Sequence, residues 1–268
     1  MAAAATAGSR ISTSGKIEER VVELIKAIEA DKGKPVTPFN RIILRFPLMA
    51  KTLGAIKSIF DAADTDASGA VEYGELVTIM SELGATMNEA ELTEVFHAAD
   101  MYDDKKLSFR EFLVGLALGS LLGLVPFTAA TSDEKPAGLR TAGEKHVKLS
   151  AAEVVTSLKE KDGRAVMQTF HLFLEAYVTF DRRHTGILRR QEIEEAMLEL
   201  TTAGATDGVG DRKQHPVPTE ALAFLSEERF KELDFDDDGK CTFAEFVYAM
   251  TSWVGIEDPD EEGEEAAE

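Results

Sequence analysis

Two twelve-residue segments of the chain place oxygen-bearing side chains at alternate positions and end in a glutamate. The first loop, DTDASGAVEYGE, covers residues 64–75, and the fourth loop, DFDDDGKCTFAE, covers residues 234–245. Ca²⁺ takes about six to eight oxygen ligands, which a loop of this length supplies from positions 1, 3, 5, 7, 9 and 12. Gly69 and Gly239 stand at position 6, where the backbone must turn sharply. Both segments therefore predict calcium sites.

All six ligand positions of these two loops carry oxygen. In the first loop the predicted metal ligands are Asp64, Asp66, Ser68, the carbonyl of Ala70, Glu72 and bidentate Glu75. In the fourth loop they are Asp234, Asp236, Asp238, the carbonyl of Lys240, Thr242 and Glu245. The fourth loop fits the complete motif Asp-x-Asp-x-Asp-Gly-x₅-Glu, in which position 9 often acts through a water molecule.

Two further segments keep the frame but lose ligands. The second loop, DMYDDKKLSFRE from Asp100 to Glu111, has Tyr102 at position 3 and a lysine in place of the glycine. The third loop, DRRHTGILRRQE at residues 181–192, carries Arg183 and Arg189 at positions 3 and 9. Cations at these positions oppose Ca²⁺ binding by direct repulsion. We therefore expect two calcium sites, with the second loop as the one candidate for a weak third, and none in the third loop.

Helices must flank the loops to position these oxygens. Apolar residues stand eight, five, four and one residues before a loop, and at mirrored spacing after it. Before the first loop they are Ile56, Ile59, Phe60 and Ala63, and after the third loop they are Ile193, Ala196, Met197 and Leu200. Four such helix–loop–helix repeats form EF-hands. Position 8 is apolar in every loop, which predicts short ladders that pair the loops two by two: Val71 with Leu107, and Leu188 with Cys241.

The predicted fold class is all-α, with two EF-hand pairs, an N-terminal helical extension and a disordered acidic tail. We expect the extension at residues 1–50, the pairs at 51–125 and 150–253, a linker at 126–149 and the tail at 254–268. An amphipathic helix is predicted at residues 16–30, and a short helix from residue 37 ends before Pro47. Ser150 and Glu153 form a capping box that restarts helix after the linker.

Composition excludes several classes of partner and location. The net charge is −20 and the pI is near 4.7, so nucleic acid and anionic membranes are poor partners.

The uncharged run at residues 112–130 is cut by Pro126, which leaves about 14 helical residues, too few to span a bilayer. Ala2 stands where an N-myristoyl anchor requires glycine. Cys241 has no disulfide partner, which favours a reducing, cytoplasmic location, with a cilium or the cytoskeleton as the alternative.

Other reactive side chains predict no chemistry. The five histidines have no metal-ligand spacing and no nucleophile partner, and phosphate-binding loops are missing from the sequence, so we expect a non-enzymatic protein. Cys241 lies among loop aspartates, which favours buried packing over redox function. The methionines Met80, Met197 and Met250 have core spacing, although a target-binding role is compatible with it.

Two flanking stretches add to the loops: Phe39-Asn40-x-Ile42-Ile43-x-x-Phe46-Pro47 before the first, and Trp253-Val254-Gly255-Ile256 followed by acids after the last. With them the sequence resembles the calmodulin-like branch of the EF-hand superfamily, and most of all a divergent plant-type subgroup. The resemblance implies Ca²⁺ sensing by the first and fourth loops. The expected partner is a protein target, either an amphipathic helix bound when helices open, or, as the alternative, a cytoskeletal or ciliary assembly in which the chain is a structural subunit.

Overall fold

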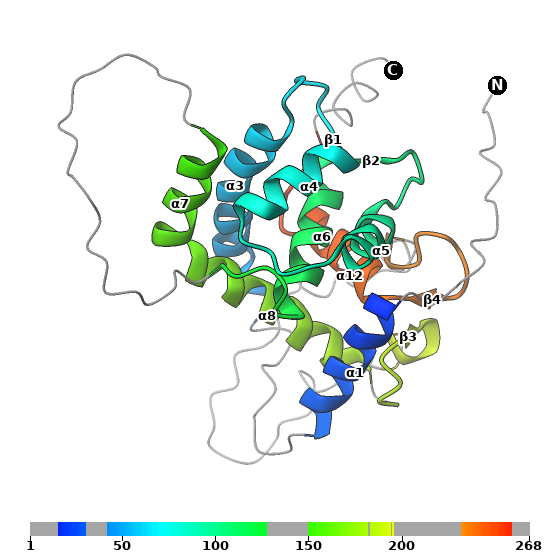
Figure 1. Ribbon diagram of the computed structural model, residues 1–268. Coiled ribbons are helices and arrows are strands. Elements are labelled where there is room, and N and C mark those ends of the chain that lie inside the picture. Colours follow the sequence, from blue (N-terminus) through cyan, green and yellow to red (C-terminus); the bar gives the residue numbers. More distant parts are fainter. Residues whose placement is uncertain are drawn as a thin grey trace, which may run out of the picture.

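A computed structural model of the chain describes residues 16–30, 42–127, 150–181, 183–193, 195 and 232–258. Helices dominate these residues, which confirms the predicted all-α class (Figure 1). The helices are α1 (Lys16–Ala30), α3 (Phe46–Ala63), α4 (Tyr73–Glu82), α5 (Glu89–Ala99), α6 (Phe109–Leu121), α7 (Ala151–Lys161), α8 (Gly163–Phe180) and α12 (Phe243–Trp253). The strands are β1 (Val71–Glu72), β2 (Lys106–Leu107), β3 (Leu188–Arg189) and β4 (Lys240–Cys241). No helix in this part of the chain is both long and apolar enough to cross a membrane.

The loops pair as the sequence predicts. Strand β1 runs antiparallel to β2 with Val71 opposite Leu107, and β3 runs antiparallel to β4 with Leu188 opposite Cys241. All four of these side chains are fully buried. Each ladder therefore joins one loop that carries a full ligand set to one that does not.

Capping boxes start the helices that leave the loops. Thr242 at position 9 of the fourth loop accepts a hydrogen bond from the Glu245 backbone, and the Glu245 carboxylate accepts one from the Thr242 backbone. Ser108 with Glu111, and Glu72 with Glu75, form the same arrangement before α6 and α4. Positions 9 and 12 thus begin a helix as well as offering oxygen to a metal ion.

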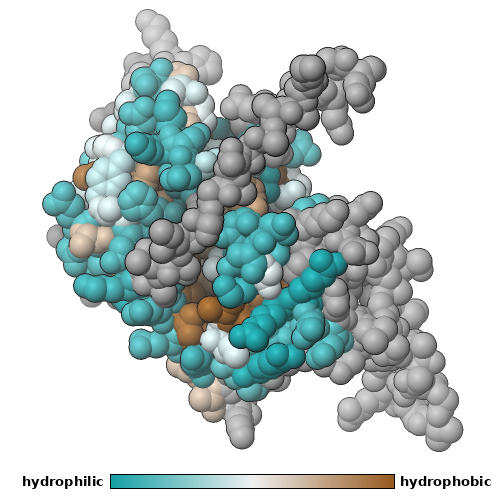
Figure 2. All heavy atoms as spheres, turned by 90° about the vertical axis from the view of Figure 1, so that its right-hand side faces the viewer, coloured by the Kyte–Doolittle hydropathy of each residue, from teal (hydrophilic) through white to brown (hydrophobic). Residues whose placement is uncertain are grey.

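Helix α1 has the predicted bounds and packs on the EF-hand body, across α5 and α8. Ile17, Val21 and Ile25 are buried, and the Ile17 backbone N–H donates to Glu94 at 3.0 Å. Val22 lies close to Gly186 of the third loop: a Cβ added at position 186 would lie 2.6 Å from Cγ1 of Val22. Figure 2 faces this side of the molecule and shows a small apolar area framed by hydrophilic atoms.

The two EF-hand pairs form one body, because their last helices pack against each other. Helices α6 and α12 make the most extensive helix–helix contact among the described elements (Figure 1). The Arg110 guanidinium lies 4.0 Å from the ring centroid of Tyr248 and donates to the Tyr248 carbonyl at 3.3 Å. Helices α7 and α8 also pack on α3, and Lys159 Nζ donates to the Leu83 carbonyl at 2.6 Å. A continuous apolar core runs through both pairs.

Two predicted segments are described only in part. Pro47 lies in the first turn of α3, where its missing N–H needs no partner, and so it begins that helix. Residues 42 and 43 before it are helical, and most of the short helix predicted from residue 37 lies outside the described residues. Residues 254–258, which the sequence assigns to a disordered tail, pack on the body because Val254 and Ile256 are apolar and Asp258 accepts from the Arg110 backbone at 3.1 Å.

The predicted linker and the helix after it are described in part. Ser150 and Glu153 form the predicted capping box at the start of α7. Pro126 and Phe127 at the start of the predicted linker are described, and Phe127 is buried against Phe170 with ring centroids 6.2 Å apart. Residues 37–41, 128–149 and 259–268 lie outside the described part, as do Ala196, Met197 and Leu200.

Candidate metal centres

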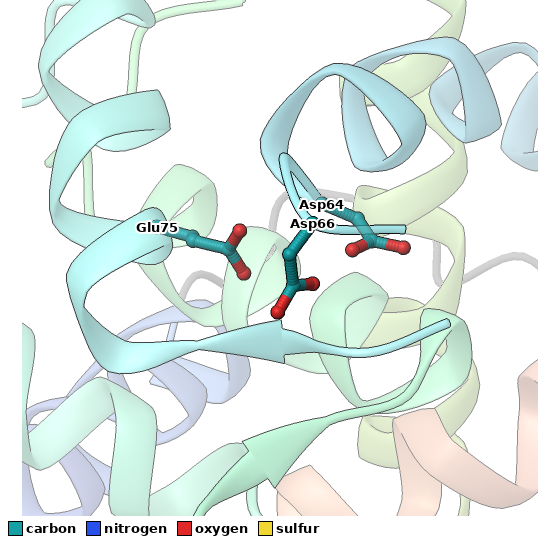
Figure 3. Close-up of side chains that lie close together, drawn as sticks. All are labelled: Asp64, Asp66 and Glu75. Carbon is teal, nitrogen blue, oxygen red and sulfur yellow. The ribbon is translucent and has the colours of Figure 1, made fainter. Parts of the chain in front are cut away.

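The first loop brings three of its predicted ligands together. Carboxylate oxygens of Asp64, Asp66 and Glu75 lie within 4.8 Å of one another, and Figure 3 shows these side chains converging between the end of α3 and the start of α4. Backbone N–H groups of Ser68 and Gly69 each donate to Asp64 at 2.9 Å. The loop backbone therefore holds the carboxylates in place.

The fourth loop repeats this arrangement in a more buried setting. Asp234, Asp236 and Glu245 have oxygens within 4.8 Å of one another, and Asp234 and Glu245 are buried. Gly239 N donates to Asp234 Oδ2 at 3.1 Å, and the hydroxyl of Thr242 donates to Glu245 at 2.7 Å. These are the two clusters of at least three metal-ligating side chains found among the described residues.

The other predicted side-chain ligands have different partners in this structure. The Glu72 carboxylate pairs with Lys106 at 3.4 Å across the first ladder, and Asp238 pairs with Lys240 at 2.8 Å. The hydroxyl of Ser68 donates to the carbonyl of Ala70, the predicted position 7 ligand, at 3.0 Å. These pairs lie at the exposed rims of the loops, where ion pairs contribute little and separate easily.

Burial gives the two sites different acid–base behaviour. Burial acts to raise the pKa of Asp64 and of Glu75, but hydrogen bonds, from Gly69 to the former and Thr65 to the latter, outweigh it and lower both pKa values. In the fourth loop burial prevails and raises the pKa of Glu245 to about 7. It raises the pKa of Asp234 too. Protons therefore compete with a cation more strongly at the fourth loop.

The second loop keeps the loop backbone without the ligand cluster. Lys105 at the glycine position has φ of 67°, a left-handed conformation that costs a residue with a side chain about 1–2 kcal/mol. Glu111 is buried and accepts from the backbone N–H of Met101 at 2.7 Å. Tyr102 turns toward the other EF-hand pair, where its ring meets Phe235 with centroids 5.2 Å apart and its hydroxyl accepts from Tyr248 at 3.0 Å.

The third loop substitutes its own cation for a metal. Glu192 is fully buried, and Arg183 Nε lies 3.7 Å from one of its oxygens. Backbone N–H groups of Arg183 and Arg189 donate to the same carboxylate at 3.2 and 3.1 Å. Asp181 is held by Thr185 N at 3.0 Å. A neighbouring arginine thus balances the charge that Ca²⁺ would balance.

Sequence reasoning missed the role of Tyr102 and Arg110 in joining the two pairs. The available signal was an aromatic side chain, Tyr102, at a ligand position. It indicates that the loop lacks a metal ligand, but it does not indicate which residues the tyrosine contacts. Partners such as Phe235 and Tyr248 lie more than a hundred residues away along the chain.

Comparisons with known proteins agree with this geometry. A family model described as an EF-hand domain pair matches residues 55–115, and a second EF-hand domain pair model matches residues 228–252. The probable calcium-binding protein CML21 of Arabidopsis thaliana is 28% identical, over 91% of this chain and 86% of its own length. The probable calcium-binding protein CML22 of the same plant is 24% identical, over 83% of this chain and 80% of its own length.

The similarity to a protein kinase covers a minor part of that kinase. Calcium-dependent protein kinase 21 of Arabidopsis thaliana is 24% identical over 76% of this chain, but the match covers 27% of the kinase. The similarity to the two calcium-binding proteins, in contrast, extends over most of both chains. The helix–loop–helix repeats and the converging carboxylates are those of EF-hands, and the matches support a calcium-binding protein of the calmodulin-like type.

Proposed function

We propose that the chain is a calcium sensor with two binding sites, in the first and fourth loops, that regulates a protein target. The observation that carries the proposal is the convergence of three carboxylates within 4.8 Å in each of these loops. The proposed ligands are those of the full loop pattern: Asp64, Asp66, Ser68, Ala70, Glu72 and Glu75, then Asp234, Asp236, Asp238, Lys240, Thr242 and Glu245. A cytoplasmic location fits the single, buried cysteine.

Glu245 connects binding to a helix movement in this proposal. Its carboxylate is the bidentate position 12 ligand, and it belongs to the capping box that starts α12. A cation that draws the carboxylate toward Asp234 and Asp236 therefore pulls on the first turn of α12. Because α12 packs on α6, calcium in the fourth loop acts on the contact that joins the two EF-hand pairs. Separation of these helices would offer apolar surface to an amphipathic target helix.

A second candidate function is that of a structural subunit in a cytoskeletal or ciliary assembly. The observation that favours it is the burial of α6 and of α12 almost along their whole lengths. In such a subunit Ca²⁺ stabilises the fold and the helices stay together. Affinity capture with and without Ca²⁺ separates the two functions, because a sensor changes its set of partners and a subunit keeps one partner at constant stoichiometry.

Calorimetric titration tests the two sites directly. We expect two Ca²⁺ ions per chain, with dissociation constants of about 10⁻⁷ to 10⁻⁵ M. Glu75→Gln and Glu245→Gln should each remove one site, since each takes away the bidentate ligand. Glu192→Gln is the matched control, because Arg183 already lies beside that glutamate and we expect no metal there. Four sites of similar affinity would contradict the proposal.

A further inference from the structure

The hydroxyl of Tyr177 lies between the third and fourth loops. Tyr177 belongs to α8, stands four residues before the third loop and is fully buried. Its oxygen accepts the backbone N–H of Leu188 at 3.2 Å. Its single proton is donated to the carbonyl of Cys241, 2.9 Å away, with the carbonyl of Gly186 within reach as a second acceptor at 3.1 Å. Gly186 and Leu188 belong to the third loop, and Cys241 belongs to the fourth. One hydroxyl therefore holds both loops.

The first EF-hand pair provides an internal comparison. Phe60 stands four residues before the first loop, and its ring meets Phe109 and Phe112 edge-on with centroids 5.4 and 5.6 Å apart. Tyr177 meets Phe243 and Phe246 edge-on with centroids 5.4 and 5.3 Å apart. The two rings occupy the same place in the two pairs. They differ by one oxygen atom, which in the second pair reaches the loop backbones.

We infer that the Tyr177 hydroxyl positions the fourth loop for calcium by tying it to the third loop. The inference rests on the proposed calcium site at residues 234–245. Cys241 follows Lys240, whose carbonyl is the proposed position 7 ligand, so a hydrogen bond that fixes β4 also fixes that oxygen. The third loop is a suitable anchor, because Arg183 and backbone N–H groups order it around Glu192 without a metal ion.

The direction of the effect follows from the geometry. The carboxylates of the fourth loop already converge to within 4.8 Å while the Tyr177 hydrogen bonds are made. The hydroxyl therefore stabilises the conformation that suits the cation, and its removal should lower affinity rather than raise it. Loss of one buried hydrogen-bonded group predicts a decrease of about fivefold in the calcium affinity of the fourth loop.

Calorimetric titration of Tyr177→Phe tests this positioning role. Phenylalanine is the residue that the first pair itself uses at this place, so the ring packing is kept. In a Glu75→Gln background, which isolates the fourth loop, Tyr177→Phe should bind Ca²⁺ about fivefold more weakly. Tyr73→Phe is the matched control: it removes a phenolic hydroxyl that contacts Thr93 at 2.9 Å in the first pair, and it should leave the fourth loop unchanged.

The first loop distinguishes positioning from general destabilisation. In a Glu245→Gln background Tyr177→Phe should leave the calcium affinity of the first loop unaltered. Equal affinity of the fourth loop with and without the hydroxyl overturns the inference, and so does an equal loss at both loops. If the unsubstituted chain binds no Ca²⁺ at the fourth loop, the proposed function fails instead.

A second measurement needs no substitution at Tyr177. If the hydroxyl joins the two loops, Ca²⁺ in the fourth loop should slow hydrogen exchange at the Leu188 amide in the third, which contains no metal. This exchange can be followed by NMR in the Glu75→Gln background. Exchange at Leu188 that is indifferent to saturating Ca²⁺ would count against the coupling even if Tyr177→Phe failed to fold.

Discussion

At the scale of single residues, the glutamate at position 12 can act as a metal ligand and can also start the helix that follows its loop. Glu75, Glu111 and Glu245 all close capping boxes with position 9, and Glu192 accepts the Arg189 backbone N–H in the same way. The glutamate therefore remains useful after a loop has lost its metal ligands, because the following helix still needs a start. This explains why the second and third loops keep position 12 while positions 3 and 6 or 3 and 9 have changed.

The acid–base difference between the two proposed sites predicts different pH dependence. Burial raises the pKa of Glu245 to about 7, whereas hydrogen bonds lower those of Asp64 and Glu75 despite their burial. Calcium binds the carboxylate form, so a proton must leave Glu245 first. Between pH 8 and pH 6 we expect the fourth loop to lose about tenfold in affinity, with little change at the first loop. Titrations in the Glu75→Gln and Glu245→Gln backgrounds measure the two separately.

Parallel pH dependence at both loops would contradict this difference.

The folding stability of the calcium-free chain should change with pH in the opposite direction to the calcium affinity. A carboxyl whose folded pKa is raised binds more protons when folded, so without calcium the stability from Glu245 is present at low pH and falls as pH rises from about 4.5 to about 7. Ca²⁺ binds the ionised carboxylate, so this decrease in folding stability should disappear when calcium is bound.

At the scale of helices and loops, the sequence predicts most of what depends on local spacing. The bounds of α1, the loop ladders and the two carboxylate clusters follow from apolar periodicity and ligand spacing within a few turns of chain. Contacts between distant segments have no such local signal. The packing of Tyr102 on Phe235 and of Arg110 on Tyr248 depends on how whole helices meet, so the sequence gives no sign of the joined pairs.

Helix α1 gives a prediction about docking. Ile25 is fully buried against the body, whereas Arg20 pairs with Glu91 at 2.8 Å in a partly exposed position. Ile25→Ala should lower the free energy of unfolding by about 2–4 kcal/mol, because it leaves a cavity. Arg20→Ala, the control on the same helix, should cost less than about 1 kcal/mol. Urea denaturation measures both variants.

Hydrophobic-dye binding completes the test of α1. Deletion of residues 1–33 uncovers the surface of α5 and α8 that the helix buries, so dye binding should rise and the melting temperature should fall. An unchanged melting curve and dye response would show that α1 is an independent docking segment in solution.

At the scale of the whole molecule, the two EF-hand pairs act as one body with an internal contact surface. Arg110 stacks on Tyr248, its backbone N–H is bonded to Asp258, and Tyr102 reaches the same ring system from the second loop. A calcium-bound state exposes apolar surface only if binding outweighs these contacts, since a ligand shifts an equilibrium by its differential affinity for the two states. In the proposed sensor, the strength of this contact therefore sets the calcium response.

Trp253 reports that response without a label. It is the only tryptophan, it is buried at the end of α12, and its Nε1 donates to Glu232 at 2.6 Å, two residues before the fourth loop. In a sensor, Ca²⁺ should shift its emission and increase dye binding, with Mg²⁺ doing much less because it demands tighter octahedral geometry. Glu245→Gln should abolish the shift, and Glu192→Gln should leave it intact.

Arg110→Ala tests whether the contact between the pairs opposes this movement. The substitution removes the cation over Tyr248 and the hydrogen bonds from the guanidinium to α12, so the helices should separate more readily. The emission shift and dye binding should then appear at lower Ca²⁺ concentration than in the unsubstituted chain. If calorimetry shows Ca²⁺ at Glu245 and neither tryptophan nor dye responds, even with Arg110→Ala, the helices do not open. The structural-subunit function then accounts for the chain better than the sensor does.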